Sequence, residues 1–283
     1  MDRRFGTRFP RIRCAVSGLA APNRMDIKTA QPPKDPQGHL SLINRWLDSP
    51  SGQLALLTTI AVIYTLAYLG HPTLPGNNLK YPLGWWGWWD QGQYLKCAAS
   101  LAHLRITADT YWYPLGYPAI GALFYRLAPQ HAFFLPDLIF VLGITALFYR
   151  IAKRLISPLE AVLIIVVFIV CYHGSLSATL VEPWNTTPTY FLSYAIIWLV
   201  ALCKPNKQRV VIGAVCVGII YLCRPTDALW MAFLLGVSIM GLSIPGDKLR
   251  AACAVFGILT CIVVSVLLVN HTVFGSCNRP TKK

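Results

Sequence analysis

The sequence predicts an all-α polytopic membrane protein, with about seven transmembrane helices and further surface helices in the first external loop. Two observations lead to this prediction. Hydrophobic residues form 55% of the 283 residues and charged residues only 13%, whereas soluble domains carry roughly a quarter charged residues. The chain also contains repeated apolar runs close to the length of about 20 residues that a spanning helix needs.

The positive charge of the chain follows a membrane pattern rather than a nucleic-acid-binding one. The formal net charge is +14, and nine Lys and Arg residues lie before residue 46. Most of the other basic residues stand in short clusters between apolar runs, as in cytoplasmic loops beside anionic lipids. We therefore predict membrane lipids as partners and no nucleic acid.

Residues 1–50 are predicted to be a basic cytoplasmic tail and linker. Residues 1–24 are rich in arginine and lack the long apolar core of a signal peptide. We interpret them as a disordered tail or as an over-extended start before Met25. The stretch 31–39 has the Pro, Gly and polar content of a linker. Residues 41–48 are predicted to form a short helix on the membrane surface.

Residues 51–272 form the predicted transmembrane module. Its fifth and sixth spans are expected to form a hairpin around "CRPTD" at residues 223–227. The polar, basic tail at 273–283 would be external, against the positive-inside trend, so we expect an aberrant tail on a truncated chain. The seven predicted spans cover residues 53–71, 131–150, 158–175, 188–203, 209–223, 226–243 and 250–270.

A further apolar piece at residues 117–128 is too short to be assigned by length alone. If it does not cross the membrane, the basic clusters at 149–154, 204–209 and 247–250 all fall on the cytoplasmic side, as the positive-inside rule favours. We therefore predict that it is an external helix within an external loop at 72–130. A loop of this length is usually functional or disordered, and its many aromatic residues argue against disorder.

Asp90 stands in this loop directly behind four tryptophans, in "WWGWWDQGQYLK" at residues 85–96. Tryptophan prefers the membrane–water boundary, so we predict a tryptophan belt that holds the loop at this depth. Asp90 could be the N-cap of the helix expected to follow it. Alternatively, partial desolvation by the tryptophans would suit a general base or a metal ligand. The residues alone leave both interpretations open.

Other residues of the external side are candidates for substrate binding. The element "YPLGYP" at residues 113–118 is expected to form a rigid turn and then start a helix. Glu182 lies near Trp184 and before a span, and it could equally belong to a membrane-anchoring segment. Arg224 could extend to the interface, pair with Asp227 or bind a lipid phosphate. The candidate binding residues are Tyr113, Tyr117, Glu182, Arg224 and Lys96.

These features together resemble the GT-C superfamily of glycosyltransferases, over about residues 53–275. The resemblance rests on the early aspartate of the first external loop, on the element at 113–118, and on "LFYRL" at 123–127 followed by "LFYRIAKRL" at 147–155. Leu115 stands where the family often has a second proline. The family has seven spans in its shared module and two surface helices in the first external loop.

The resemblance also implies roles for individual residues. It makes Asp90 the catalytic acid/base and Glu182 a second acidic residue that helps with the acceptor or with a metal. A divalent ion, Mg²⁺ or Mn²⁺, could then be held by Asp90 and Glu182. The expected partners are a polyprenyl-phosphate-linked sugar and a glycan, lipid or protein acceptor. The expected location is a bacterial inner membrane, with the active site on the external face.

The resemblance implies an inverting reaction. Asp90 would take the proton of the acceptor hydroxyl, the oxygen would attack the anomeric carbon, and polyprenyl phosphate would leave. A cationic side chain such as that of Arg224 would stabilise the departing phosphate.

Two other functions stay open. A non-catalytic membrane scaffold, or a truncated remnant of an enzyme, would explain a chain that ends soon after its seventh predicted span. A transporter would need polar residues within its spans, or broken helices in related halves. The charged residues of this chain gather outside the predicted spans, which favours a transferase over a transporter.

Overall fold

The computed structural model describes residues 36–201, 206–242 and 245–275, and these contain eleven α-helices and no β-strand. The predictions for residues 1–35 and for most of the tail at 273–283 lie outside this part of the chain. The predicted linker at 31–39 is wrong at its end, because residues 36–39 belong to α1. The helices are α1 Pro36–Asp48, α2 Pro50–Leu69, α3 Trp89–Ala102, α4 Gly116–Tyr125, α5 Phe134–Ala152, α6 Pro158–Cys171, α7 His173–Leu176, α8 Thr186–Ile196, α9 Lys207–Cys223, α10 Pro225–Met240 and α11 Pro245–Gly275.

Three helical segments of the described residues are long and apolar enough to cross a membrane: Pro50–Leu69, Pro129–Ala152 and Gly246–Gly275. A fourth crossing results if α6 and the following segment His173–Val181 are counted as one span, although they are bent by 85°. The remaining predicted spans coincide with α8, α9 and α10, which are shorter. The chain is therefore a helical membrane protein with several spans.

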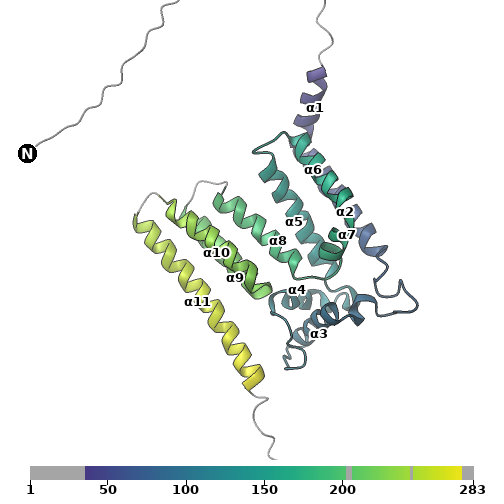
Figure 1. Cartoon of the computed structure of the whole chain (residues 1–283), viewed down its shortest axis with the longest axis vertical. Coiled ribbons are helices and arrows are strands. Elements are labelled where there is room, and N and C mark those ends of the chain that lie inside the picture. Colours follow the sequence, from purple (N-terminus) through teal and green to yellow (C-terminus); the bar gives the residue numbers. More distant parts are fainter. Residues whose placement is uncertain (1–35, 202–205, 243–244, 276–283) are drawn as a thin grey trace, which may run out of the picture.

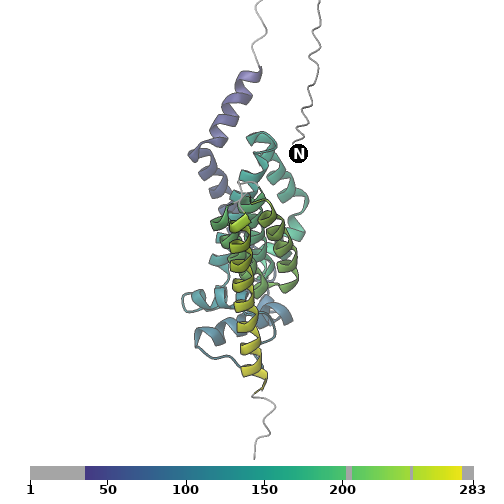
Figure 2. The same cartoon turned by 90° about the vertical axis from the view of Figure 1, so that its left-hand side faces the viewer.

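The helices run back and forth between two ends. At the first end, the hydroxyl of Tyr149 donates to the carbonyl of Leu47 (3.0 Å), and the backbone N–H of Leu159 donates to Asn44 (2.9 Å). At the other end, the amide of Asn185 donates to the carbonyl of Cys223 (2.9 Å). Figures 1 and 2 both show α1 at the first end and α3 and α4 at the second. The segment between α2 and α5 therefore covers one end of the bundle.

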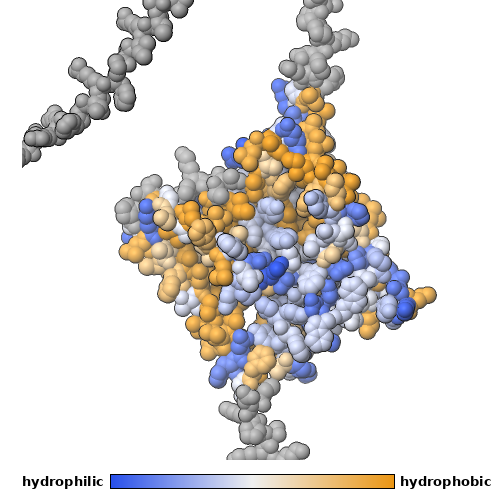
Figure 3. All heavy atoms as spheres, viewed as in Figure 1, coloured by the Kyte–Doolittle hydropathy of each residue, from blue (hydrophilic) through white to orange (hydrophobic). Residues whose placement is uncertain are grey.

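The outer surface of the bundle is apolar. Phe256, Leu267 and Leu268 of α11 are exposed, and so are Val167 of α6 and Phe233 of α10. Figure 3 shows a hydrophobic surface over α10 and α11 and a more hydrophilic one near α3. A continuous exposed apolar surface of this kind is unstable in water and suits contact with lipid.

The segment between α2 and α5 folds as the sequence predicts in part. The piece predicted as a surface helix at 117–128 is α4, which packs on α3, α5 and α9. The predicted tryptophan belt is wrong for two of its four residues, Trp85 and Trp86. Trp85 is fully buried with its ring 5.5 Å from that of Tyr68, and Trp86 is also buried. Only Trp88 and Trp89 are exposed, because the 3₁₀ turn Gly84–Gly87 directs the first two indoles into the core.

One buried hydrogen bond joins α4 to α5. The hydroxyl of Tyr117 donates to Oδ2 of Asp137 (2.7 Å), and both residues are buried. The other oxygen of Asp137 has no partner among the described residues. The Tyr117 ring stacks on Phe133, with 4.3 Å between ring centroids. This contact fixes the helix whose start lies beside the candidate site.

We expect Tyr117→Phe to lower the free energy of unfolding by about 1–3 kcal/mol, because it leaves a buried carboxyl group without its donor. Tyr125→Phe on the same helix is the control, since no hydrogen bond joins the Tyr125 hydroxyl to another described residue, and it should cost less than about 0.5 kcal/mol. Unfolding in detergent, followed by circular dichroism, measures both. Equal stability of the two variants would contradict the role given to the Tyr117 hydroxyl.

Candidate functional site

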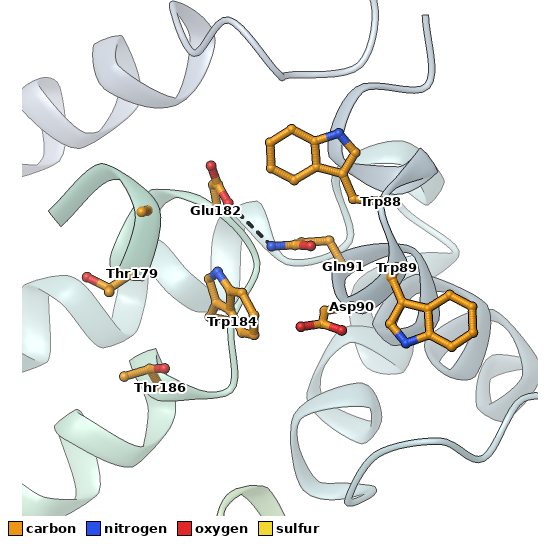
Figure 4. A pocket seen from close by; sticks show the side chains of 9 residues that line it. Trp88, Trp89, Asp90, Gln91, Thr179, Glu182, Trp184 and Thr186 are labelled. Atoms are coloured by element: carbon orange, nitrogen blue, oxygen red, sulfur yellow. Dashed lines mark hydrogen bonds between the residues drawn. The ribbon is translucent and has the colours of Figure 1, made fainter. Parts of the chain in front are cut away.

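A pocket of about 600 Å³ lies at the end of the bundle covered by α3, and it brings Asp90 and Glu182 together. These two carboxylates come from segments about ninety residues apart in the chain. Figure 4 shows Asp90 and Gln91 pointing from α3 toward the segment that carries Glu182 and Trp184. The lining residues are Trp88, Trp89, Asp90, Gln91, Ala178, Thr179, Glu182, Trp184 and Thr186.

Asp90 is not the N-cap of α3, so that interpretation of the sequence is wrong. The helix begins two residues earlier than the capping interpretation requires, and Trp88 is its N-cap, with φ −82° and ψ 156°. Asp90 lies in the first turn, where the helix dipole favours a negative charge. Its half-buried carboxylate instead accepts a hydrogen bond from the Tyr113 hydroxyl at Oδ1.

Tyr113 links the "YPLGYP" element to the pocket. Its ring lies 4.9 Å from that of the buried Tyr94, which is one turn beyond Asp90 on α3. Burial and the hydrogen bond to Asp90 raise the pKa of Tyr113 to about 12. The phenol therefore stays protonated near neutral pH and remains a donor to Asp90.

Glu182 is held at the back of the pocket by a π-helical turn, Ser177–Val181. Its backbone N–H donates to the Ser177 carbonyl (3.0 Å), and this wide turn is a type often found at functional sites. Glu182 is 9% exposed, and Gln91 donates to its Oε2 (3.3 Å). Burial raises the pKa of Glu182. A buried carboxylate with one side toward a pocket is suited to accept a hydrogen bond from a ligand.

Arg224 lies at the rim of the pocket. It precedes α10, and its Nη1 donates to the hydroxyl of the lining residue Thr186 (3.2 Å). Its Nε also lies 3.4 Å from Oδ2 of Asp227, as one of the sequence interpretations predicted. The backbone just before Arg224 packs closely on the start of α4. A Cβ on Gly116 would lie 2.8 Å from the carbonyl oxygen of Leu222. The guanidinium keeps unused donors on its half-exposed side.

Of the five predicted binding residues, only Glu182 lines the pocket; Tyr113 and Arg224 contact its lining residues Asp90 and Thr186, whereas Lys96 and Tyr117 do not. Lys96 is exposed on α3 and is not among the residues that line it. Tyr117 is fully buried, and its hydroxyl is committed to Asp137. Tyr117 thus joins α4 to α5, whereas Tyr113, four residues earlier, contacts Asp90.

The residues present do not fit a resident metal ion. Within the described segments, no three His, Cys, Asp or Glu side chains come together as a metal-binding group. Asp90 and Glu182 share a pocket, but one oxygen of each already accepts a hydrogen bond from a protein donor. Protein sites for Mg²⁺ or Mn²⁺ depend on several oxygen ligands.

Sequence reasoning missed two residues that line the pocket and one that lies beside it. Gln91, Thr186 and His71 contact the predicted residues Glu182 and Arg224. Gln91 directly follows Asp90, and Thr186 lies in "EPWNTTP" at 182–188, so their nearness in the chain was an available signal. His71 comes directly after the first span and carries no comparable signal.

Comparison with known proteins does not assign the chain to a family. No protein-family model matches it, and neither the curated proteins nor the solved structures give a match.

Proposed function

We propose that the chain is a membrane glycosyltransferase of GT-C type, which moves a sugar from a polyprenyl-phosphate donor to an acceptor hydroxyl at the external face. The observation that carries this proposal is the pocket itself. One carboxylate, Asp90, is oriented by Tyr113, a second, Glu182, faces the same space, and a cation, Arg224, stands at the rim.

The lining of the pocket suits a sugar. Three indole rings, those of Trp88, Trp89 and Trp184, provide flat apolar surfaces, while Gln91 and Glu182 provide planar hydrogen-bonding groups. The volume of about 600 Å³ is within the range of small-molecule sites.

A second, apolar groove supports a lipid-linked donor. It has a volume of about 570 Å³ and lies between residues 111–119, the end of α9 and the last turns of α11. Tyr113 and Pro225 line this groove, and they adjoin Asp90 and Arg224 of the first pocket. A polyprenyl chain in the groove would place its phosphate near Arg224 and its sugar near Asp90.

The proposed reaction follows from these positions. Asp90 takes the proton of the acceptor hydroxyl. At the same time, the oxygen of that hydroxyl forms a bond to the anomeric carbon. The bond from that carbon to the phosphate oxygen breaks, and its electron pair leaves with polyprenyl phosphate. Attack opposite to the leaving group inverts the anomeric centre. Arg224 stabilises the charge that develops on the phosphate, with two parallel hydrogen bonds available.

We further propose seven crossings, with α2, α5, α6, α8, α9, α10 and α11 alternating in direction. The short helices support this arrangement because they also expose apolar residues, such as Val167 on α6 and Phe233 on α10. Arg150, Lys153, Arg154 and Arg250 lie at the end opposite the pocket. The positive-inside rule places that end in the cytoplasm and the pocket outside.

Single cysteines at four positions are expected to alternate in labelling, in a chain without its nine native cysteines. Leu79→Cys and Thr226→Cys should react with an impermeant thiol reagent in intact bacterial cells that express the protein. Leu155→Cys and Asn206→Cys should react only after permeabilisation. All four residues are exposed, so accessibility is matched. Labelling of Leu155→Cys but not Leu79→Cys in intact cells would invert the proposed topology.

The two other candidate functions make different demands on the structure. The bend of 85° between α6 and the segment His173–Val181 is the observation that favours a transporter. However, the pocket lies where α3 and α8 begin, at the ends of helices, whereas transporter sites lie near the bilayer midplane. A scaffold would not require a buried carboxylate in an open pocket, which costs stability without a ligand.

The proposal is tested by comparing donors. Protein in lipid nanodiscs is incubated with a radiolabelled sugar on polyprenyl phosphate, or with the same sugar on a soluble nucleotide, together with a membrane extract as acceptor. We expect transfer from the lipid-linked donor alone. Transfer from the nucleotide sugar instead would contradict the proposed donor class.

A further inference from the structure

His71 is a buried histidine beside the pocket that the proposed reaction does not use. It follows α2, and its ring lies 5.1 Å from that of Trp85. Its Nδ1 is 3.3 Å from the backbone nitrogen of Thr73 and 2.8 Å from the Thr73 hydroxyl. Its Nε2 is 3.6 Å from Oε1 of Glu182. The ring therefore stands between a fixed turn and a residue of the pocket.

The Thr73 backbone fixes which nitrogen of His71 carries the proton. A backbone N–H can only donate, so the Nδ1 that faces it must be an acceptor. A histidine with an unprotonated Nδ1 is neutral and carries its proton on Nε2. Burial lowers the pKa of His71, which also favours the neutral ring. The Nε2–H consequently points at the carboxylate of Glu182.

Glu182 thus has N–H groups on both of its oxygens. Gln91 of α3 donates to Oε2, and His71 presents its Nε2–H toward Oε1. The titratable side chains around this carboxylate are His71, from the segment after α2, and Asp90, which shares the pocket. Burial raises the pKa of Glu182, whereas its hydrogen bond with Trp184 lowers that pKa, and the two N–H groups also favour the ionised form.

We propose that His71 is a positioning residue of the site. As the Nε2–H tautomer, it holds Glu182 ionised and oriented so that the carboxylate accepts a hydrogen bond from a hydroxyl group of the substrate. The part of this inference that concerns substrate rests on the proposed glycosyltransferase function. The tautomer and its coupling to Glu182 do not depend on that function.

Two substitutions of His71 separate positioning from packing. Glutamine places an amide N–H near the position of Nε2, whereas the shorter asparagine reaches only the position of Nδ1. We expect His71→Asn to raise KM for a polyprenyl-phosphate-linked hexose by roughly tenfold, because the Glu182 carboxylate loses the polar N–H group 3.6 Å from its Oε1, with a smaller change in kcat. His71→Gln should restore most of the loss. Equal impairment in both variants would show that the ring acts by packing alone and would overturn the proposal.

The pH profile gives a second readout in the same assay. Loss of the Nε2–H donor raises the pKa of Glu182 above its already raised value, because the carboxylate is then less stabilised. The acid limb of the activity profile should therefore move to higher pH in His71→Asn and stay in place in His71→Gln. An acid limb that moves equally in both variants would count against the proposed contact.

An experiment without turnover decides the tautomer. The chain has six histidines, so ¹⁵N-labelled histidine in nanodiscs gives a tractable NMR spectrum, and His71→Gln assigns the signal. We expect an unprotonated Nδ1 and a protonated Nε2 at neutral pH. In Glu182→Gln, the pKa of His71 should fall further, because a neighbouring negative charge is removed. A protonated Nδ1, or a His71 pKa that is the same in Glu182→Gln and the wild type, would overturn the inference. This holds even if the transferase assay fails for every donor.

Discussion

Replacing Asp90 by asparagine should reduce sugar transfer by roughly 10²–10⁴-fold, the range supplied by a general base. The amide has nearly the same shape as the carboxylate but cannot take a proton from the acceptor hydroxyl. Folding should be unaffected, because Asp90 is not the N-cap of α3 and makes no capping hydrogen bond. The hydrogen bond that Asp90 accepts from Tyr113 can be accepted by the amide oxygen as well.

Asp109→Asn is the matched control, since Asp109 is an exposed acid in the same segment and does not line the pocket. It should leave transfer within about twofold of the wild type, as expected for a surface substitution. Tyr113→Phe should have an intermediate effect, because it removes the donor that orients Asp90. Unchanged turnover in Asp90→Asn would remove this residue from the mechanism.

The second large effect is expected at Arg224. If its guanidinium stabilises the leaving phosphate, Arg224→Ala should lower kcat by roughly 10²–10³-fold, the range for one preorganised donor. Arg224→Lys should lie between the alanine variant and the wild type, because lysine keeps the charge but not the paired hydrogen bonds. An increase in KM with unchanged kcat would instead mean that the contact is equally strong in the bound ground state and in the transition state.

The contact with Asp227 provides the control for Arg224. Both side chains are about one-third exposed, so their ion pair contributes at most about 1 kcal/mol to folding. Asp227→Asn breaks the pair and should leave kcat unchanged if Arg224 acts on phosphate. If kcat and KM are unchanged in Asp227→Asn and in both arginine variants, Arg224 has only a structural role in the hairpin between α9 and α10.

Part of this site could be predicted from the sequence, because two kinds of signal were strong. The alternation of apolar runs and basic clusters predicts which loops share one end of the bundle, and Asp90, Glu182 and Arg224 do meet at one end. The Pro-rich element predicts a turn before a helix, and Tyr113 does adjoin Asp90.

Other features depend on contacts that composition does not encode. The start of α3 at Trp89 follows from the turn that buries Trp85 and Trp86, so neither the cap nor the belt could be assigned from residue types. Tyr113 and Tyr117 each precede a proline in the sequence, but Tyr113 lies before α4 and contacts Asp90, whereas Tyr117 lies in the first turn of α4 and faces the core. The ends of α6 and α8 are likewise set by a break and by a π-helical turn within apolar runs.

The central claim is that the pocket transfers sugar from a lipid-linked donor, with Asp90 as the base. The most direct measurement uses the full chain in nanodiscs, polyprenyl phosphate bearing a labelled sugar, and a membrane extract as acceptor. Chromatography follows release of polyprenyl phosphate, and NMR of the product gives its anomeric configuration. The account predicts equimolar release and transfer with inversion by the wild type, and neither above background by Asp90→Asn. Retention of configuration, or transfer that is equal in the two proteins, would contradict it.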